Sequence, residues 1–326
     1  MKKPEVSLII PVYNFEKYIA TTLESAFRQD YSNLEIIVIN DGSNDKSQKI
    51  VSELQHTHNN LRLINQENMG VSVARNTGIE AANGEYILFS DADDLLNTDY
   101  VSYLVKNAIE HDADISIGTG IYTNYKIGNL NAANPNENIA VLSKDEALLK
   151  MLTYWYPIGC YCRAFRKSLF DNGLRFIPGQ KVGEGFTFNI KAIQLSDKIV
   201  VGNKPIYCYR RDNSDSCMTS FSITRSREAV NSIHIIRSLF NSPTNEIAMA
   251  LDFAEWHTKG DMYNWMALSG SEKNYPEEFK DYYRAVRLFS KKALTLNINR
   301  KERLRAFLQT LHPNLMVQIL KFRKNI

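Results

Sequence analysis

The first third of the chain alternates short apolar runs with amphipathic stretches. Between the first two runs, Ile19, Leu23 and Ala26 recur with helical spacing. Short apolar runs separated by helical segments are typical of parallel strands joined by crossover helices. We therefore predict an α/β fold with a Rossmann-like, mainly parallel sheet and helices on both faces. The apolar runs lie at residues 6–10, 34–39, 61–64 and 85–89.

The pattern changes in the middle of the chain. A polar, Asn-rich stretch at residues 124–138 predicts an exposed loop or hairpin. Ser143 and Glu146 have the spacing of a capping box, so we predict a helix that starts there and runs to about Thr153. From about Ser222 onward, apolar residues recur with helical spacing, which predicts a helical C-terminal extension.

The composition and charge exclude several classes of protein. A net charge of +3 on 326 residues does not indicate a nucleic-acid-binding protein. The apolar run at residues 6–12 is too short for a signal-peptide core or a membrane span, so we expect neither a secreted nor an integral membrane protein. The four cysteines lack C-x-x-C spacing and the six histidines lack H-x-x-x-H spacing. We therefore expect reduced thiols in a cytoplasmic protein and no zinc site.

In an open parallel sheet, ligands bind beyond the carboxyl ends of the strands, so the loops there carry the candidate site. The loop after the first run contains Tyr13 and Asn14 and lacks the Gly-rich turn that nicotinamide dinucleotides require. Asp41 ends the second run, and its carboxylate is suited to accept hydrogen bonds from a uracil imide or a ribose hydroxyl. The alternative is that Asp41 only forms a turn with Gly42 and Ser43.

Three aspartates follow the fourth apolar run. Asp91 and Asp93 are two residues apart, where alternate carboxylates can share one divalent cation and leave coordination sites for diphosphate oxygens. The alternative is that these residues cap the next helix, which would suit Asp94 better than the other two. A nucleotidyltransferase would also use paired carboxylates and a metal, but its usual Gly-rich, basic N-terminal loop is absent.

Taken together, these motifs resemble the family 2 inverting glycosyltransferases of the GT-A fold, of the bacterial capsule or exopolysaccharide type. The resemblance covers roughly the first 120 residues and continues less sharply through residues 162–170 and 182–218. The matching segments read VSLIIPVYN at residues 6–14, VINDGS at 38–43, NMG at 68–70, ARNTG at 74–78 and FSDADD at 89–94.

The resemblance implies a metal-dependent hexosyltransferase with a nucleotide diphosphate sugar, expected to be a UDP-sugar, as donor. It implies that Asp91 and Asp93 form a D-x-D motif for Mn²⁺ or Mg²⁺. It also implies that Arg75 faces the diphosphate or the ribose, and that Arg210 and Arg211 lie in a loop that folds over the diphosphate. The residues expected to contact the nucleotide sugar are Pro11, Tyr13, Glu16, Asp41, Arg75, Asp91, Arg210 and Arg211.

The same resemblance assigns roles to three parts of the chain. Residues 1–118 are expected to form the nucleotide-sugar-binding half of the GT-A domain and residues 119–221 the acceptor-binding half. Residues 222–326 are the helical C-terminal extension. The expected acceptor is a glycan or a lipid-linked oligosaccharide, and the expected process is surface polysaccharide biosynthesis.

The catalytic base is where this sequence departs from the family. Inverting transfer needs a carboxylate that removes the acceptor proton, and in the family this is usually the Asp of a Glu-Asp pair that opens a helix. Here Gly185 stands where that Asp is expected, directly after Glu184. Glu184 is therefore the candidate base, or else an ordinary helix-start Glu that the helix dipole stabilises. In the second case the chain would be a donor-binding but inert subunit that supports a partner transferase.

The last part of the chain combines basic and apolar residues. Two interpretations stay open for it. A basic amphipathic helix can lie on the cytoplasmic face of an anionic membrane, which would suit a lipid-linked acceptor. Alternatively, the helices pack on the body of the protein and keep their cations in solvent. The basic residues are Arg300, Lys301, Arg303, Arg305, Lys321, Arg323 and Lys324, against Glu302 alone.

Overall fold

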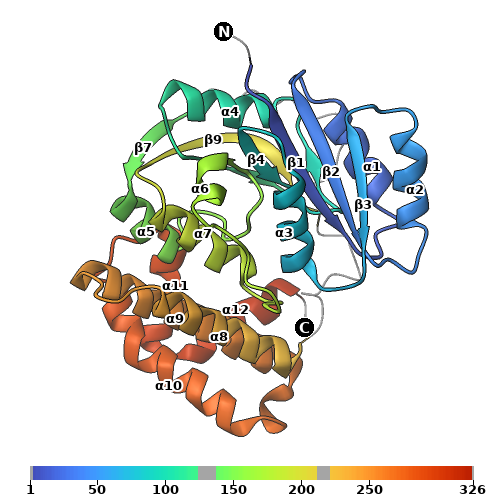
Figure 1. The fold of residues 1–326 in the computed structure, drawn as a ribbon. Coiled ribbons are helices and arrows are strands. Elements are labelled where there is room, and N and C mark those ends of the chain that lie inside the picture. Colours follow the sequence, from blue (N-terminus) through green and yellow to red (C-terminus); the bar gives the residue numbers. More distant parts are fainter. Residues whose placement is uncertain (1–2, 124–136, 211–220, 325–326) are drawn as a thin grey trace. The chain divides into compact units, whose positions relative to one another are not determined.

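The computed structural model describes residues 3–123, 137–210 and 221–324, which belong to two compact units (Figure 1). Unit 1 comprises Met1–Ala147 and Gly159–Ser214, and unit 2 comprises Leu148–Ile158 and Asp215–Ile326. The predicted division after residue 118 falls inside unit 1 and stays a prediction. Most of the predicted Asn-rich loop lies outside the described residues.

Unit 1 has the predicted α/β architecture, and its elements follow the apolar and amphipathic segments of the sequence. The strands are β1 (Val6–Val12), β2 (Leu34–Asp41), β3 (Leu61–Gln66), β4 (Tyr86–Phe89), β5 (Leu95–Leu96), β6 (Ile115–Tyr122), β7 (Ile139–Ser143), β8 (Arg163–Arg166) and β9 (Lys198–Cys208). The helices are α1 (Ile19–Phe27), α2 (Ser47–Gln55), α3 (Val71–Ala81), α4 (Tyr100–Glu110), α6 (Lys167–Asp171) and α7 (Glu184–Gln194).

One mixed sheet runs through unit 1 in the order β3-β2-β1-β4-β8-β6-β9-β5, with β7 paired to β9. Strands β3, β2, β1 and β4 are parallel, and so are β6 and β9. Strand β8 is antiparallel to both of its neighbours, and β5 and β7 are antiparallel to β9. The carboxyl ends of β1, β2 and β4 therefore meet at one edge, where the predicted site residues follow.

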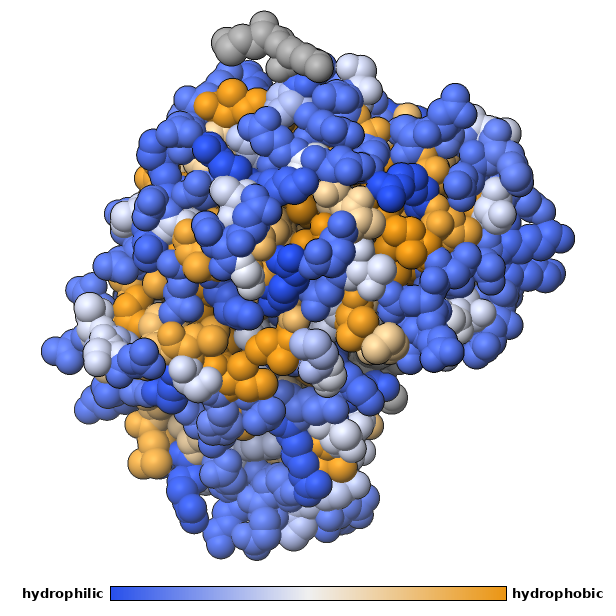
Figure 2. Space-filling model, viewed as in Figure 1, coloured by the Kyte–Doolittle hydropathy of each residue, from blue (hydrophilic) through white to orange (hydrophobic). Residues whose placement is uncertain are grey.

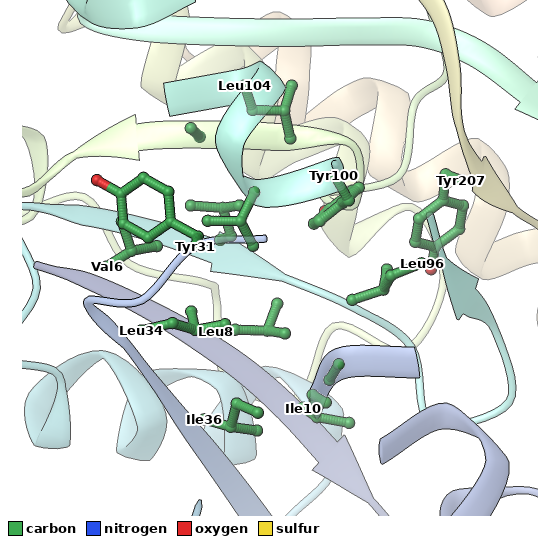
Figure 3. Close-up of a cluster of buried hydrophobic side chains, with 14 of the residues drawn as sticks. Val6, Leu8, Ile10, Tyr31, Leu34, Ile36, Leu96, Tyr100, Leu104 and Tyr207 are labelled. Carbon is green, nitrogen blue, oxygen red and sulfur yellow. The ribbon is translucent and has the colours of Figure 1, made fainter. Parts of the chain in front are cut away.

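Helices cover both faces of the sheet. Val6, Leu8 and Ile10 project from one face of β1 into a core shared with α1 and α4, as Figure 3 shows. Ile9 points to the other face, where it meets α3 at Gly78. The predicted arrangement of a mainly parallel sheet between helices is confirmed.

Helix α5 (Lys144–Leu152) starts with the predicted capping box. The Glu146 carboxylate accepts hydrogen bonds from the backbone N–H and the hydroxyl of Ser143, at 2.9 and 2.8 Å. The Ser143 hydroxyl in turn accepts one from the Glu146 backbone N–H at 3.4 Å. The two residues thus satisfy each other's first-turn donors, as the spacing predicts.

Unit 2 is helical, as predicted for the C-terminal extension. Side-chain oxygens of Ser222, Thr244 and Asn299 cap α8, α9 and α11. No helix in the described part of the chain combines the length and the apolar character needed to cross a bilayer. The elements are α8 (Ile223–Ser238), α9 (Asn245–Ser269), the short 3₁₀ helix η1 (Ser271–Lys273), α10 (Pro276–Ala293), α11 (Arg300–Leu311) and α12 (Pro313–Lys324).

Candidate active site

Hydrogen bonds connect the loop that follows β1 to the loop that follows β2. The Asn14 backbone N–H donates to the Ser43 hydroxyl at 3.1 Å, and the Asn14 side-chain oxygen accepts from the Asn44 N–H at 2.8 Å. The carboxylate of Glu16 accepts from the Lys46 N–H at 2.9 Å, where α2 begins. Of the residues predicted to line a nucleotide pocket here, Pro11 is buried and Tyr13 and Glu16 are exposed at the sheet edge.

Asp41 organises the next loop. It is the last residue of β2 and is almost fully buried. Its carboxylate accepts hydrogen bonds from the side-chain amide of Gln66 at 2.7 Å and from the backbone N–H groups of Met69 and Gly70, both at 2.9 Å. These bonds shape the turn at residues 68–70 that leads into α3. Asp41 therefore has a structural role, and a contact with a nucleotide stays a prediction.

The close packing of α3 on β1 positions Arg75 at the centre of the site. Gly78 lies one turn further along the helix on the same face. A Cβ at Gly78 would lie only 2.4 Å from Cγ2 of Ile9, so glycine is needed for this packing. The helix buries Arg75 to 4% exposure, and its guanidinium lies 5.2 Å from the centre of the Phe176 ring.

The Arg75 guanidinium joins two of the predicted site carboxylates. Its Nη2 lies 3.0 Å from Oδ1 of Asp91, and its Nη1 lies 2.9 Å from Oε1 of Glu184. Glu184 is the first residue of α7, after Gly183 in the left-handed conformation at φ 75°. The guanidinium of Arg75 thus contacts a carboxylate 16 residues away in sequence and another 109 residues away. We call Arg75, Asp91 and Glu184 the carboxylate bridge.

Burial sets the electrostatics of this bridge. Burial alone would lower the pKa of Arg75, but the nearby Cys160, Asp91 and Glu184 raise it above its ordinary value. Burial raises the pKa of Asp91; Arg75 opposes that shift, and Asp93 and Glu184 add to it. The site therefore concentrates negative charge that one guanidinium offsets only in part, which favours a further cation beside Asp91 and Asp93.

Asp94 does not cap a helix, contrary to the alternative considered from the sequence. The short strand β5 follows it, and the residue before α4 is Asp99. The buried Asp94 carboxylate accepts hydrogen bonds from the Tyr207 hydroxyl at 2.6 Å and from the Arg210 backbone N–H at 2.8 Å. Burial and the nearby Asp91 raise the pKa of Asp94 to about 8. These two hydrogen bonds hold the end of β9 beside the D-x-D segment, residues 91–93.

Arg210 lies against the same segment. Its Nε donates to the backbone oxygen of Asp93 at 2.6 Å, and its guanidinium lies 4.9 Å from the centre of the Tyr18 ring. The positive charge of Arg210 is therefore held next to Asp93 and near Tyr18, the residue before α1. Arg211, the other predicted phosphate contact, lies outside the described residues.

Asp91 and Asp93 fit a divalent cation that is bound together with a ligand. Their carboxylates are the hard oxygen donors that Mg²⁺ and Mn²⁺ prefer. Among the described residues, no group of three or more His, Cys, Asp or Glu side chains is arranged to hold a metal by itself. A cation at Asp91 and Asp93 would complete its coordination with water and with oxygens of a bound diphosphate, which is usual for Mg²⁺.

Aromatic residues that the sequence argument did not single out support the site. Tyr207, which binds Asp94, stacks on Tyr161 with ring centres 4.8 Å apart. Phe176, which faces Arg75, stacks on Phe188 of α7 at 3.9 Å. The alternation of Tyr207 and Tyr209 along the end of β9 was the signal available in the sequence, but their partners lie far away in the chain.

A cavity in unit 1 lies apart from this site. It has a volume of about 1000 Å³ and runs along α4, where Tyr31, Tyr103 and Lys106 are among its lining residues. None of the predicted site residues lines it.

A comparison with known proteins decides the family. The family model described as "Glycosyl transferase family 2" matches residues 7–174, just over half of the chain. The chain belongs to this family. The match includes β1, the D-x-D segment and Arg75 and ends before α7, so Glu184 and Arg210 lie beyond it.

Three relatives in the family show how far the likeness extends. Glycosyltransferase GlyG of Streptococcus pneumoniae serotype 4 is 31% identical over 69% of this chain and 77% of that protein. Glycosyltransferase GlyA of the same organism is 35% identical over 63% of this chain, but the match spans only 30% of GlyA. The minor teichoic acid biosynthesis protein GgaB of Bacillus subtilis is 30% identical over 66% of this chain and 24% of GgaB.

Solved structures share the fold. Residues 1–349 of S. aureus TarS, in complex with UDP-GlcNAc, match with a TM-score of 0.63 and 20% identity, over 98% of this chain and 92% of that fragment. The mannosyltransferase PcManGT of Pyrobaculum calidifontis, in complex with GDP-Man and Mn²⁺, matches with a TM-score of 0.58 and 17% identity, over 98% and 87% of the two chains. The predicted GT-A fold is confirmed.

Proposed function

We propose that this chain transfers a sugar from a UDP-sugar to an acceptor hydroxyl with inversion of the anomeric centre. The observation that carries the proposal is the carboxylate bridge, in which Arg75 holds Asp91 and Glu184 together at the carboxyl edge of the sheet. In an open α/β sheet this edge is where ligands bind. Asp91, a proposed metal ligand, and Glu184, the proposed base, contact the two terminal nitrogens of one rigid guanidinium.

On the donor side, the chain supplies fixed charges and hydrogen-bonding groups. The turn held by Asp41, together with Tyr13, would line the nucleoside, and Arg210 would face the diphosphate beside Asp93. Asp91 and Asp93 would hold Mn²⁺ or Mg²⁺, which supplies Lewis-acid stabilisation of the charge that develops on the departing diphosphate. TarS has been captured with UDP-GlcNAc and PcManGT with GDP-Man and Mn²⁺, and these donors motivate the choice.

On the acceptor side, Glu184 is the proposed base. Its Oε1 is held by Arg75, so Oε2 is the atom that would receive the proton of the acceptor hydroxyl. Ion pairing with a guanidinium makes a carboxylate a weaker base, but it also fixes the direction in which the carboxylate points. Attack by the hydroxyl forms the new glycosidic bond while the bond to the diphosphate breaks, in one displacement that inverts the anomeric centre.

A second function is favoured by Gly185. It is buried at the second position of α7, where the family's usual base is expected and no carboxylate is present. The chain would then bind the donor and support a partner transferase without turning over. This alternative and the first proposal make opposite predictions for substitutions at positions 184 and 185.

The test measures nucleotide diphosphate release from a panel of UDP- and GDP-sugars with Mn²⁺. If Glu184 is the base, Glu184→Gln lowers release about 10²–10⁴-fold, since general-base catalysis contributes that much. Gln keeps the shape and a hydrogen-bond acceptor for Arg75, so folding is preserved. Gly185→Asp then adds little. The opposite result would support the inert subunit. In that case the unchanged chain binds UDP but releases none from the donors, and Gly185→Asp does release it.

We further propose that the acceptor is a growing surface glycan or a lipid-linked oligosaccharide on the cytoplasmic side of the membrane. The relative GgaB is named as a minor teichoic acid biosynthesis protein, and this name motivates the proposal. On this proposal residues 119–221 contribute the acceptor-binding half of the GT-A domain, and residues 222–326 keep the chain near its acceptor. Transfer of radiolabelled sugar to a membrane extract, compared with a soluble extract, tests this part.

A further inference from the structure

Helix α11 is oriented with its polar side inward and its apolar side outward. Glu302, Arg305 and Gln309 are 2%, 7% and 0% exposed. Leu304, Phe307 and Leu311 are 58%, 52% and 57% exposed. At about 100° per residue these two sets lie on opposite sides of the helix. A surface helix ordinarily has the reverse arrangement, so the exposed apolar stripe calls for a physical explanation.

Ion pairs and hydrogen bonds inside unit 2 hold α11 in this orientation. Nη2 of Arg305 lies 2.9 Å from Oδ1 of Asp261 and donates to the backbone oxygen of His257 at 3.1 Å. Oε2 of Glu302 lies 3.3 Å from Nε2 of His257, whose ring stacks on Tyr154 with ring centres 3.8 Å apart. Rotating the helix to bury its leucines would break these contacts. The outward position of the apolar stripe is therefore built into the unit.

Basic residues surround the stripe. Arg300, Lys301 and Arg303 are all exposed, and their helical positions place Arg303 on one flank and Lys301 on the other. The one acidic residue of α11, Glu302, is on the buried side. We call Leu304, Phe307 and Leu311 with Arg300, Lys301 and Arg303 the basic-apolar face.

The neighbouring helices α10 and α12 also expose apolar side chains, and α10 exposes basic ones. Helix α10 packs beside α11 and exposes Leu288 at 77%, and α12 exposes Phe322 at 86%. In the sequence from residue 284 to 326, eleven lysines and arginines stand against one acidic residue, Glu302. Elsewhere polar residues cover most of the surface seen in Figure 2, and apolar residues gather in separate patches. The exposed basic residues of α10 are Lys280, Arg284, Arg287, Lys291 and Lys292.

We propose that the basic-apolar face of α11 binds an anionic lipid surface. Leu304, Phe307 and Leu311 would enter the boundary between head groups and acyl chains, while the flanking cations contact lipid phosphates. A second copy of the chain fits this face poorly, because symmetric pairing would bring two sets of like charges together. An anionic membrane offers an apolar boundary to the stripe and phosphates to the basic residues beside it.

This inference deepens the proposed function and rests on it in one respect, which is that the acceptor is found at a membrane. Docking through α11 would raise the concentration of the chain where a lipid-linked acceptor lies. Binding to vesicles is measured without donor or acceptor, and release of UDP is measured without vesicles. Failure of one proposal is therefore distinguishable from failure of the other.

The experiment is flotation of the full chain with phosphatidylcholine vesicles and with vesicles that contain about 30% phosphatidylglycerol, at low and high salt. The unchanged chain is expected to float with the anionic vesicles, and less so at high salt because the cations are screened. It is expected to bind pure phosphatidylcholine at least about tenfold more weakly, since the electrostatic attraction is then missing.

Two triple variants test the two components of the face. Leu304→Ser with Phe307→Ser and Leu311→Ser removes the stripe, and Arg300→Gln with Lys301→Gln and Arg303→Gln removes the rim. Each is expected to weaken binding to anionic vesicles about tenfold or more. All six side chains are exposed, so the unfolding temperature should fall little, with the small loss coming from the contact of Lys301 with Glu302.

Matched controls come from unit 1. Ile109→Ser with Leu195→Ser removes exposed apolar side chains, and Lys49→Gln with Lys106→Gln removes exposed cations. Neither control should change flotation. The proposal is overturned if the chain does not float with anionic vesicles, if the controls weaken binding as much as the α11 variants, or if the face instead mediates self-association that the serine variant abolishes.

Discussion

At the scale of single residues, Arg75 is the side chain on which the site depends. A guanidinium presents several N–H groups in a rigid plane, so one residue can bind Asp91 and Glu184 at the same time. Lysine carries the same charge as a single point and cannot reproduce both contacts. Arg75 is 4% exposed, and the two carboxylates that face it offset the cost of burying its charge.

Replacing Arg75 with methionine should therefore destabilise unit 1 by about 2–4 kcal/mol. Loss of one partner from a buried ion pair costs about 3–5 kcal/mol. The estimate is lowered because the side chains of Asp91 and Glu184 keep 31% and 21% exposure. Urea denaturation measures the change in the free energy of unfolding.

The control is Arg62→Met, which removes a surface ion pair with Glu35 in which Arg62 is 45% exposed. It should cost less than about 1 kcal/mol. Equal losses for the two variants would contradict the role assigned to Arg75.

The sequence predicted that Asp41, Asp91 and Asp93 lie at the carboxyl ends of parallel strands, and the structure has Asp41 at the end of β2 and the other two after β4. The sequence could not predict their partners. Tyr207 binds Asp94 from 113 positions away, and Glu184 meets Arg75 from 109 positions away. Such contacts depend on where β9 and α7 return to the sheet, which local periodicity does not encode.

At the scale of elements, the packing of α3 on β1 positions Arg75. Gly78 allows the contact, because a side chain there would collide with the fully buried Ile9. Glycine in the middle of a helix normally costs stability relative to alanine. Here the close approach of helix and strand outweighs that cost.

Substituting Gly78 with alanine should destabilise the protein even though alanine favours helix. Overpacking a core costs about 1–3 kcal/mol, which exceeds the roughly 1 kcal/mol gained in helix propensity. In an Ile9→Ala background the same substitution should cost less, because the colliding Cγ2 is absent. A double-mutant cycle of unfolding free energies measures this coupling, and additive effects would contradict the proposed contact.

Helix α11 shows what periodicity leaves open at this scale. The spacing of Leu304, Phe307 and Leu311 predicts a helix with one apolar side, and the cations in the sequence indicated an interfacial helix. Periodicity does not say which side faces the protein. That choice is made by His257 and Asp261 of α9, which bind the polar side of α11.

At the scale of the whole molecule, both units have apolar cores. Unit 2 also contains a buried polar group between α9 and α11, formed by His257, Glu302 and Arg305. Burial opposes ionisation of Glu302, yet His257, Arg305 and Lys301 lower its pKa below the ordinary value. Glu302 is 3% exposed at its side chain and is therefore linked to the stability of unit 2.

This link predicts an acid-sensitive contribution from Glu302. Because its folded-state pKa is lowered, the contribution is fully present above the unfolded pKa of about 4.3 and is lost as pH falls through the folded value. The unchanged chain should be more stable than Glu302→Gln at neutral pH, and the difference should narrow below about pH 4. Thermal unfolding between pH 3 and 7 provides the test; a difference that does not vary with pH would contradict the ion-pairing role.

The central claim is that the sheet edge around Asp91, Asp93 and Glu184 transfers sugars from a nucleotide donor. Its most direct test is release of UDP from a donor panel with Mn²⁺, comparing the unchanged chain with Asp93→Asn and with the exposed control Asp112→Asn. Metal-assisted departure of the diphosphate contributes several kcal/mol, so Asp93→Asn should release UDP about a hundredfold more slowly or worse, and the control should match the unchanged chain. Equal release by Asp93→Asn and the unchanged chain would contradict the account.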